Sequence, residues 1–342
     1  MKKNWARAAA IGLMTVVFLF FFLRSVQWNQ VFSYLKDVNI PLFILLVPLG
    51  SMHLVTRALR WRYLLIHEKK DVKFYNMFAG NAVGFTVNFI FPGRIGELIK
   101  PLYLAQKEGI RKGYAVGTVV VERIFDMLTM CFLLGVFLLA KPLYASFFNA
   151  NEEAYRSLYF WGKIGGIFAI GLLLIVLSLY FFRSQTLKAV SFMLKPFPAR
   201  VTRKVLALSD EFIEGLKFFH SWRTALVYAG MSLVVWLAIM FFYWIMLFAY
   251  HIHIPFFLLI PYVFLTGVGA SIPTPGMVGG YDYFSKLGLT SLYAIDANLA
   301  VGMTLVVHAI QVVVTCIIGY VILGKEGLSL LQIKKMGESV KA

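Results

Sequence analysis

Charged side chains inside an apolar stretch are the first residues of this sequence that could do chemistry. Glu122, Arg123 and Asp126 lie within an apolar run over residues 115–140. A charge in hydrocarbon costs roughly 2.5–3.5 kcal/mol on insertion scales, so each one needs a compensating interaction. Glu122 and Asp126 are four residues apart and share a helix face, and Arg123 is three residues from Asp126 and can pair with it. Two interpretations stay open: a structural salt-bridge cluster between helices, or the polar wall of a substrate path.

Two glycine-rich turns carry the second group of candidate residues. The segments Pro92-Gly93-Arg94-Ile95-Gly96 and Pro275-Gly276-Met277-Val278-Gly279 share the spacing P-G-x-x-G and start 183 residues apart. A short helix is expected after each turn, and the free amide groups at a helix N-terminus form a site for an anion such as a lipid phosphate. Arg94 would add a fixed positive charge. The glycines would admit a ligand close to the backbone or allow tight helix packing in lipid.

Three further polar residues belong to the candidate substrate-binding set. Glu97 and Asp282 fall in the first turns of the two short helices, where they could complement the helix dipole, hold a cationic headgroup or exchange protons. His308 lies within the last apolar run, as a packed polar residue, a proton carrier or a pore-lining residue. The sequence has no HExxH motif, no GxSxG motif and no Cys/His cluster. We therefore predict no catalytic residue, no metal and no cofactor.

The composition sets the class of protein to which these residues belong. Of 342 residues, 60% are hydrophobic and 14% are charged, with a mean hydropathy of +0.77. A soluble domain carries about a quarter charged residues. The formal net charge is +17, but the basic residues lie between apolar runs, which is typical of membrane topology and lipid contact rather than of nucleic-acid binding. The sequence predicts a multi-pass all-α integral membrane protein of the cytoplasmic membrane.

Apolar runs give the expected membrane spans. Six are long enough to cross a bilayer, at residues 8–23, 41–59, 115–140, 161–182, 224–250 and 299–323. Two further apolar stretches, 74–106 and 255–292, are interrupted by Pro and Gly and predict re-entrant helical hairpins. Residues 183–222 predict a cytoplasmic amphipathic connector that lies on the membrane surface.

Basic residues predict the topology. They gather in residues 1–7, 57–73, 94–112, 183–223 and the tail after Gly324. All five segments can be cytoplasmic only when the 74–106 stretch enters and leaves on one side, with both termini cytoplasmic. Residues 41–140 then match residues 224–323 in opposite orientation within one domain, 1–342. This is an inverted-topology repeat, which many transporters use to place a site near the membrane midplane.

These motifs, in this order, resemble the transmembrane flippase-like region of bacterial lysylphosphatidylglycerol synthases and its stand-alone relatives. The resemblance covers nearly the whole chain. It rests on Asn88 followed by the segment from Pro92 to Glu97, on Glu122 to Asp126, and on Pro273-Thr274-Pro275-Gly276 with Gly279. Positions that match the family directly are Arg94, Glu97, Glu122, Arg123 and Asp126.

The resemblance implies a module that moves aminoacylated phosphatidylglycerol or another lipid between leaflets. The chain departs from the family pattern twice. It has Gly276 to Asp282 where the family usually has Gly-Gly-x-Gly followed by Glu, and it has His308 where the family usually has Arg. The soluble aminoacyl-transferase domain is absent from the sequence, so lysyl transfer is not expected.

Three hypotheses for function remain open. The first is a lipid flippase or scramblase for an anionic or aminoacylated phospholipid or a polyprenyl-linked lipid, with the phosphate at the re-entrant helix N-termini. The second is a membrane enzyme or enzyme subunit in headgroup modification, related to phosphatidylglycerol lysyltransferase or to polyprenyl glycosyl transfer. The third is a scaffold that recruits a separate cytoplasmic lipid-modifying enzyme through residues 183–223. The expected partners are membrane lipids, with such an enzyme or a second copy as protein partners and no nucleic acid.

Overall fold

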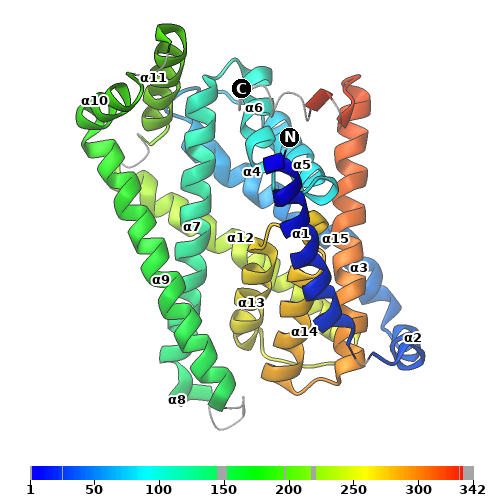
Figure 1. The fold of residues 1–342 in the computed structure, drawn as a ribbon. Helices are drawn as coiled ribbons and strands as arrows, with labels where there is room; N and C mark the ends of the chain where they lie inside the picture. The colour runs from blue at the N-terminus through cyan, green and yellow to red at the C-terminus, as the bar shows by residue number, and fades with distance from the viewer. Residues whose placement is uncertain are drawn as a thin grey trace.

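The chain folds into a helical bundle in which several long helices run roughly along the long axis of the molecule and others cross it obliquely (Figure 1). The computed structural model describes residues 2–24, 26–144, 152–195, 198–216, 221–330 and 332–333, and these contain no strand. The predicted all-α class is therefore confirmed for the described residues. The helices are α1 (Lys2–Leu23), α2 (Trp28–Lys36), α3 (Ile40–Gly50), α4 (Met52–Leu65), α5 (Phe74–Ile90), α6 (Gly96–Glu108), α7 (Lys112–Leu139), α8 (Lys141–Tyr144), α9 (Glu152–Phe181), α10 (Arg183–Met193), α11 (Ala199–Glu214), α12 (Trp222–Ala249), α13 (Ile260–Ser271), α14 (Gly280–Tyr293) and α15 (Ala297–Lys325), with 3-10 helices η2 (Phe256–Leu259) and η3 (Pro275–Met277).

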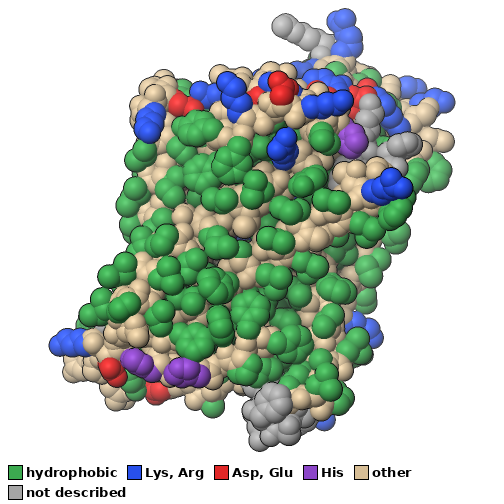
Figure 2. Space-filling model, turned by 180° about the vertical axis from the view of Figure 1, so that it is seen from behind, with side chains coloured by type: hydrophobic (Ala, Val, Ile, Leu, Met, Phe, Trp, Pro, Cys, Tyr) green, Lys and Arg blue, Asp and Glu red, His purple; other side chains and the backbone are tan. Residues whose placement is uncertain are grey.

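The surface and the helix lengths are those of a membrane protein. Figure 2 shows a wide band of hydrophobic side chains between two ends that carry the charged ones, with Lys and Arg gathered mostly at one end. Four helical segments among the described residues are long and apolar enough to cross a membrane, and the bent pair α1–α2 adds a fifth. They lie at Ile40–Leu65, Leu158–Phe181, Trp222–Ala249 and Ala297–Lys325. The helix α7 is as long as α12, at 28 residues, but carries three charged side chains in its middle.

Each interrupted stretch forms two helices that pack side by side, α5 with α6 and α13 with α14. The helices of each pair cross at glycines. A Cβ on Gly96 would lie 1.9 Å from the Gly84 carbonyl oxygen, and a Cβ on Gly269 would lie 2.6 Å from the Gly280 carbonyl oxygen. Because no side chain fits at these crossings, the glycines allow the close packing of the helices.

The two halves of the chain share one order of elements. The pairs are α3–α4 with α12, α5 with η2–α13, α6 with α14, and α7 with α15. Moving α6 by the 183 residues that separate the two turns gives 279–291, and α14 spans Gly280–Tyr293. In Figure 1 the α5–α6 pair lies toward one end of the molecule and the α13–α14 pair toward the other, while α7 and α15 run through both levels.

The predicted connector contains two helices, α10 and α11, at the end of the molecule that also holds α6 (Figure 1). The helix α11 packs against the start of α7, where a Cβ on Gly117 would lie 2.6 Å from the Phe212 carbonyl oxygen. Arg111 joins this region, because its guanidinium contacts Glu68 at 2.5 Å and also pairs with Glu214 of α11. Residues 196–197 and 217–220 of the connector, and residues 334–342 of the basic tail, lie outside the described residues.

Candidate functional site

The charged residues of α7 meet two arginines of α4. Asp126 accepts from Arg57 at 2.8 Å and from Arg60 at 2.6 Å, and Glu122 lies 3.2 Å from a guanidinium nitrogen of each arginine. All four side chains are buried. The predicted common face of Glu122 and Asp126 is confirmed, since both carboxylates contact the same two arginines.

A lysine from the first hairpin completes the buried part of this cluster. Lys100 of α6 donates to the Glu122 carboxylate at 2.6 Å, and its ammonium group lies 4.4 Å from the centre of the Trp61 ring. Lys100 is only 2% exposed. Glu122 therefore binds α4, α6 and α7 together, because its oxygens face cations from two other helices.

Two residues form the partly exposed edge of the cluster. Arg123 contacts Glu97 at 3.2 Å and Asp126 at 3.4 Å. Their side chains are partly open, at 31% for Arg123 and 23% for Glu97. The predicted pair of Arg123 with Asp126 is confirmed. We call the set Arg57, Arg60, Glu97, Lys100, Glu122, Arg123 and Asp126 the charged cluster.

Asn88 changes the expectation of an anion site at the first helix N-terminus. Its side-chain oxygen accepts from the Gly96 N–H at 2.8 Å, and the N–H groups of Glu97 and Leu98 donate to carbonyl oxygens of the preceding turn. The prediction of free amide groups at the start of α6 is therefore wrong. A buried helix end without solvent needs such partners, and here the chain supplies them itself.

The second hairpin has its own polar group, separate from the charged cluster. His308 of α15 contacts the Asp282 carboxylate at 2.6 Å and the Gly276 carbonyl oxygen at 2.9 Å, and Asp282 accepts from the Gly279 N–H at 2.8 Å. Gly276 and Gly279 have φ of 62° and 85°, a backbone conformation that suits glycine. The turn that begins at Pro275 is thus tied to α15.

The two hairpins contact each other at their turns. A Cβ on Gly276 would lie 3.2 Å from the carbonyl oxygen of Phe89, at the end of α5. The Arg94 guanidinium donates to the carbonyl oxygen of Ala270, at the end of α13. Gly93 itself is open, since nothing lies within 4 Å of its Cβ position. Arg94 therefore connects the first turn to the second hairpin.

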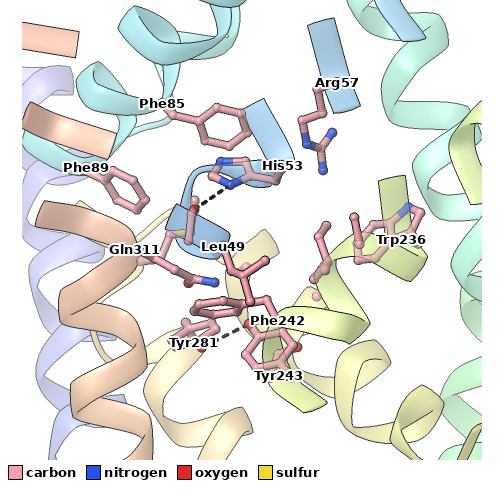
Figure 3. A pocket seen from close by; sticks show the side chains of 17 residues that line it. Leu49, His53, Arg57, Phe85, Phe89, Trp236, Phe242, Tyr243, Tyr281 and Gln311 are labelled. Atoms are coloured by element: carbon pink, nitrogen blue, oxygen red, sulfur yellow. Dashed lines mark hydrogen bonds between the residues drawn. The ribbon is translucent and has the colours of Figure 1, made fainter. Parts of the chain in front are cut away.

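A cavity of about 140 Å³ lies between the two halves of the chain. Figure 3 shows His53 and Arg57 at one end of it and Tyr243, Tyr281 and Gln311 at the other. Most of the remaining wall is aromatic or aliphatic, and α5, α12 and α13 all contribute to it. Since Arg57 lines the cavity and also holds the charged cluster, the cavity and the cluster are adjacent.

Charge balance decides what this arrangement can bind. The charged cluster together with Arg94 holds five cationic side chains and three carboxylates, a formal excess of two positive charges. Buried charges need partners. Arg94 interacts electrostatically with both Glu97 and Arg123, so the three side chains form one edge. An anion at this edge would balance that excess. Among the described residues, no group of three His, Cys, Asp or Glu side chains is placed to hold a metal ion.

Sequence reasoning missed three members of the cluster. Arg57, Arg60 and Lys100 were expected to be cytoplasmic loop charges, and the structure corrects this, because α4 continues to Leu65 and buries both arginines. The buried neighbours Ala58, Trp61 and Leu64 lie among them. That continued apolar pattern, with the arginines three residues apart, was the available signal.

The fold and the charged cluster define a helical, multi-pass integral membrane protein with ion pairs buried between its helices. The chain belongs to the family described as the lysylphosphatidylglycerol synthase TM region, whose profile matches residues 5–319. It is also similar to a protein of Methanocaldococcus jannaschii named UPF0104 membrane protein MJ1595, with 24% identity over 230 residues. That alignment covers 65% of this chain and 66% of the relative.

Proposed function

We propose that the protein moves a lipid between the leaflets of the cytoplasmic membrane. The substrate is an anionic or aminoacylated phospholipid or a polyprenyl-linked lipid, and its phosphate binds at the edge formed by Arg94 and Arg123. The observation that carries this proposal is the excess of two positive charges beside a cavity between the two halves of the chain. A lipid phosphate supplies negative charge, and guanidinium groups bind phosphate in a fork geometry.

The proposed topology has six full spans and two re-entrant hairpins in an inverted repeat, with both termini cytoplasmic. The α5–α6 and α13–α14 pairs lie toward opposite ends of the molecule, which supports hairpins that enter from opposite sides (Figure 1). The start of α1 and the end of α15 lie at the same end as α10 and α11. That end carries most of the basic side chains seen in Figure 2, as the positive-inside rule expects of a cytoplasmic face.

The arginine edge suits a phosphate better than the helix N-termini do. Asn88 occupies the Gly96 N–H and Asp282 occupies the Gly279 N–H. Arg94 Nε, by contrast, has no hydrogen-bond partner among the described residues, and Arg123 is partly exposed. The proposed phosphate therefore meets side-chain donors, and the helix ends are held by the protein.

The ion pairs of the two buried carboxylates, Glu122 and Asp126, favour lipid translocation over headgroup chemistry. A general base needs a lone pair free to take a proton. Glu122 faces Arg57, Arg60 and Lys100, and Asp126 faces Arg57, Arg60 and Arg123, so both carboxylates are held by cations. Ion pairs of this kind position other groups rather than accept protons.

Lipid exchange in proteoliposomes tests the proposal. The purified protein is reconstituted with a trace of fluorescent phosphatidylglycerol, and the fraction bleached by an impermeant reductant is followed with time. We expect fast exchange for the parent protein and at least a tenfold slower rate for Arg94→Ala and Arg123→Ala, because each removes a donor from the phosphate. Fluorescent phosphatidylcholine, with no net charge, is expected to exchange more slowly than phosphatidylglycerol.

Lys163→Ala is the matched control, because Lys163 is an exposed basic residue on α9 outside the charged cluster. It should exchange lipid at the parent rate. Exchange by Arg94→Ala and Arg123→Ala at the parent rate would rule out the arginine edge as the phosphate site. A parent protein that moves none of the anionic lipids, including polyprenyl phosphates, would overturn the proposed function itself.

A further inference from the structure

His308 is placed between two groups that accept hydrogen bonds. Its Nδ1 lies 2.6 Å from Asp282 Oδ1, and its Nε2 lies 2.9 Å from the carbonyl oxygen of Gly276. A carbonyl oxygen only accepts, so Nε2 must carry a proton. A neutral imidazole has a single N–H, which leaves Nδ1 without one. The short contact between Nδ1 and Asp282 then requires a second proton.

That second proton has two allowed positions. Either Nδ1 carries it, as an imidazolium facing a carboxylate, or Asp282 carries it and donates to Nδ1. Asp282 Oδ2 accepts from the Gly279 N–H at 2.8 Å in both arrangements. In each of them the pair holds one proton more than a neutral histidine beside an ionised aspartate, and its total charge is zero.

Because the His308–Asp282 pair is buried, the position of the turn relative to α15 depends on this proton. His308 and Asp282 are 7% and 2% exposed. Loss of the proton would leave a single N–H for two acceptors. With that N–H on Nε2, Nδ1 and Asp282 Oδ1 face each other as acceptors at 2.6 Å; with it on Nδ1, Nε2 faces the Gly276 carbonyl oxygen at 2.9 Å without a proton. Loss of the proton would also leave one negative charge in an apolar region, where an isolated ion is strongly disfavoured. One of the two His308 contacts that hold the turn against α15 would then break.

No neighbouring cation among the described residues pairs with the Asp282 carboxylate in place of the proton. Lys286 lies one helical turn after Asp282, but its ammonium group donates to the Phe22 carbonyl oxygen of α1. From the first hairpin, Arg94 donates to Ala270. His53 and Arg57 lie across the cavity from Tyr281 (Figure 3). Among the described residues, Asp282 has no ion-pair partner other than His308.

The remaining groups around the pair lead to the cavity. The Tyr281 ring lies 4.7 Å from the His308 ring, between centroids, and its hydroxyl lies 3.0 Å from the Tyr243 hydroxyl of α12. Tyr281, Tyr243 and Gln311 all line the cavity. The His308 ring therefore packs against Tyr281, whose hydroxyl belongs to the polar groups that line the cavity beside the charged cluster.

We infer that His308 and Asp282 form a proton-binding site that controls the turn of the second hairpin. With the proton bound, His308 holds the Gly276 carbonyl and Asp282 holds the Gly279 N–H, so the turn is fixed to α15. When the proton leaves, one N–H remains for two acceptors, so His308 loses either its contact with Asp282 or its contact with Gly276, and the turn is released. The ligand is a proton, and its occupancy makes the position of the hairpin depend on pH.

Asp282→Asn is the sharpest test, because asparagine can reproduce the protonated pair without a titratable proton. Its amide oxygen can accept from the Gly279 N–H and its NH₂ group can donate to Nδ1 of a neutral His308, whose Nε2–H still donates to Gly276. Hydrogen–deuterium exchange of the 274–283 segment is measured in lipid nanodiscs at about pH 6 and about pH 9. Rates are corrected for the intrinsic effect of pH.

In the parent protein we expect protection of this segment to fall at least tenfold at the higher pH. The Asp282→Asn protein should stay protected at both values. His308→Gln, which cannot hold the proton, should show low protection that does not change with pH, and it carries the test if Asp282→Asn fails to fold. Segments of α12 serve as the internal control and should be unaffected.

Two outcomes would overturn the inference. One is protection in the parent protein that does not change over this range. The other is a pH dependence in Asp282→Asn equal to that of the parent. The readout requires no lipid movement, so its result is independent of the translocation assay.

Discussion

Asp126 shows what single residues contribute to the polar interior. It faces Arg57, Arg60 and Arg123 and is 5% exposed. We predict that Asp126→Asn lowers the free energy of unfolding by about 3–5 kcal/mol, because it leaves buried arginines without a counter-charge. The loss is measured by denaturant unfolding in mixed micelles.

Asp210→Asn is the matched comparison, because it breaks an ion pair whose two side chains are each 39% exposed. An exposed pair of this kind contributes about 1 kcal/mol or less. Equal losses for the two variants would mean that burial does not set the cost, and the view of Asp126 as the centre of a dry cluster would fail.

At this scale the sequence predicted the acidic half of the site better than the basic half. Acidic residues in an apolar run have no role in topology, so Glu122 and Asp126 stood out. Arginine and lysine near span ends are typical of cytoplasmic loops, so Arg57 and Lys100 were assigned to the surface. Only the packing of α4 and α6 against α7 distinguishes these cations from topology charges.

The docking of α11 on α7 gives a prediction at the scale of elements. A Cβ on Gly117 would meet the Phe212 carbonyl oxygen at 2.6 Å, whereas nothing lies within 4 Å of the Cβ position of Gly135 on the same helix. We predict that Gly117→Ala destabilises the protein by about 1–3 kcal/mol through overpacking. Gly135→Ala should be neutral or slightly stabilising, since alanine favours helix. Melting temperatures in detergent compare the two, and equal values would contradict the close contact.

The stability of the region where α11 packs on α7 should depend on pH through the Arg111–Glu68 ion pair. Arg111, at the start of α7, donates to both oxygens of Glu68, and this holds the pKa of Glu68 below its ordinary value of 4.5. A lowered pKa means that the pair stabilises the folded protein above the ordinary value and loses that effect as pH falls through the lowered one. The stability difference between the parent and Glu68→Gln should therefore be present in full at about pH 7 and should shrink as the pH falls below the ordinary value of 4.5. A difference of the same size at about pH 7 and at about pH 3 would contradict the ion pair, and denaturant unfolding at the two pH values measures it.

Element boundaries followed the sequence closely where proline and glycine mark them. The predicted breaks at Pro92-Gly93 and at Pro273 to Gly276 fall between α5 and α6 and between α13 and α14, so they are confirmed. The packing of the connector was harder to predict, because the amphipathic pattern of residues 183–222 does not show which helices cover its apolar side. In the structure α7 and α9 both contact α11, a long-range fact that no local pattern contains.

Topology gives the prediction at the scale of the whole molecule. In a variant with Cys131 and Cys316 replaced by serine, a cysteine at Lys112 should react with an impermeant thiol reagent only from the cytoplasm. A cysteine at Lys36 should react only from outside. Both positions are exposed in the structure and lie at opposite ends. Labelling of position 112 from outside would contradict the proposed mirrored arrangement.

The order of the helices was predictable because the two halves of the sequence repeat the same pattern of apolar runs and turns. The spacing of 183 residues between the two turns predicted which helices correspond, and the order of elements repeats at that distance. Contacts between the halves were not predictable in this way. The approach of Gly276 to Phe89, and the contact of Arg94 with Ala270, depend on how the two copies are packed together.

The contact between the two turns also matters for the ion gradients across the membrane. A protein with this many polar groups in the hydrophobic band would dissipate ion gradients if water ran continuously past them. Backbone of one hairpin lies directly against backbone of the other where Gly276 approaches Phe89. If this contact is the barrier to water, no side chain there can rotate to open it, and we expect opening to require movement of a whole hairpin.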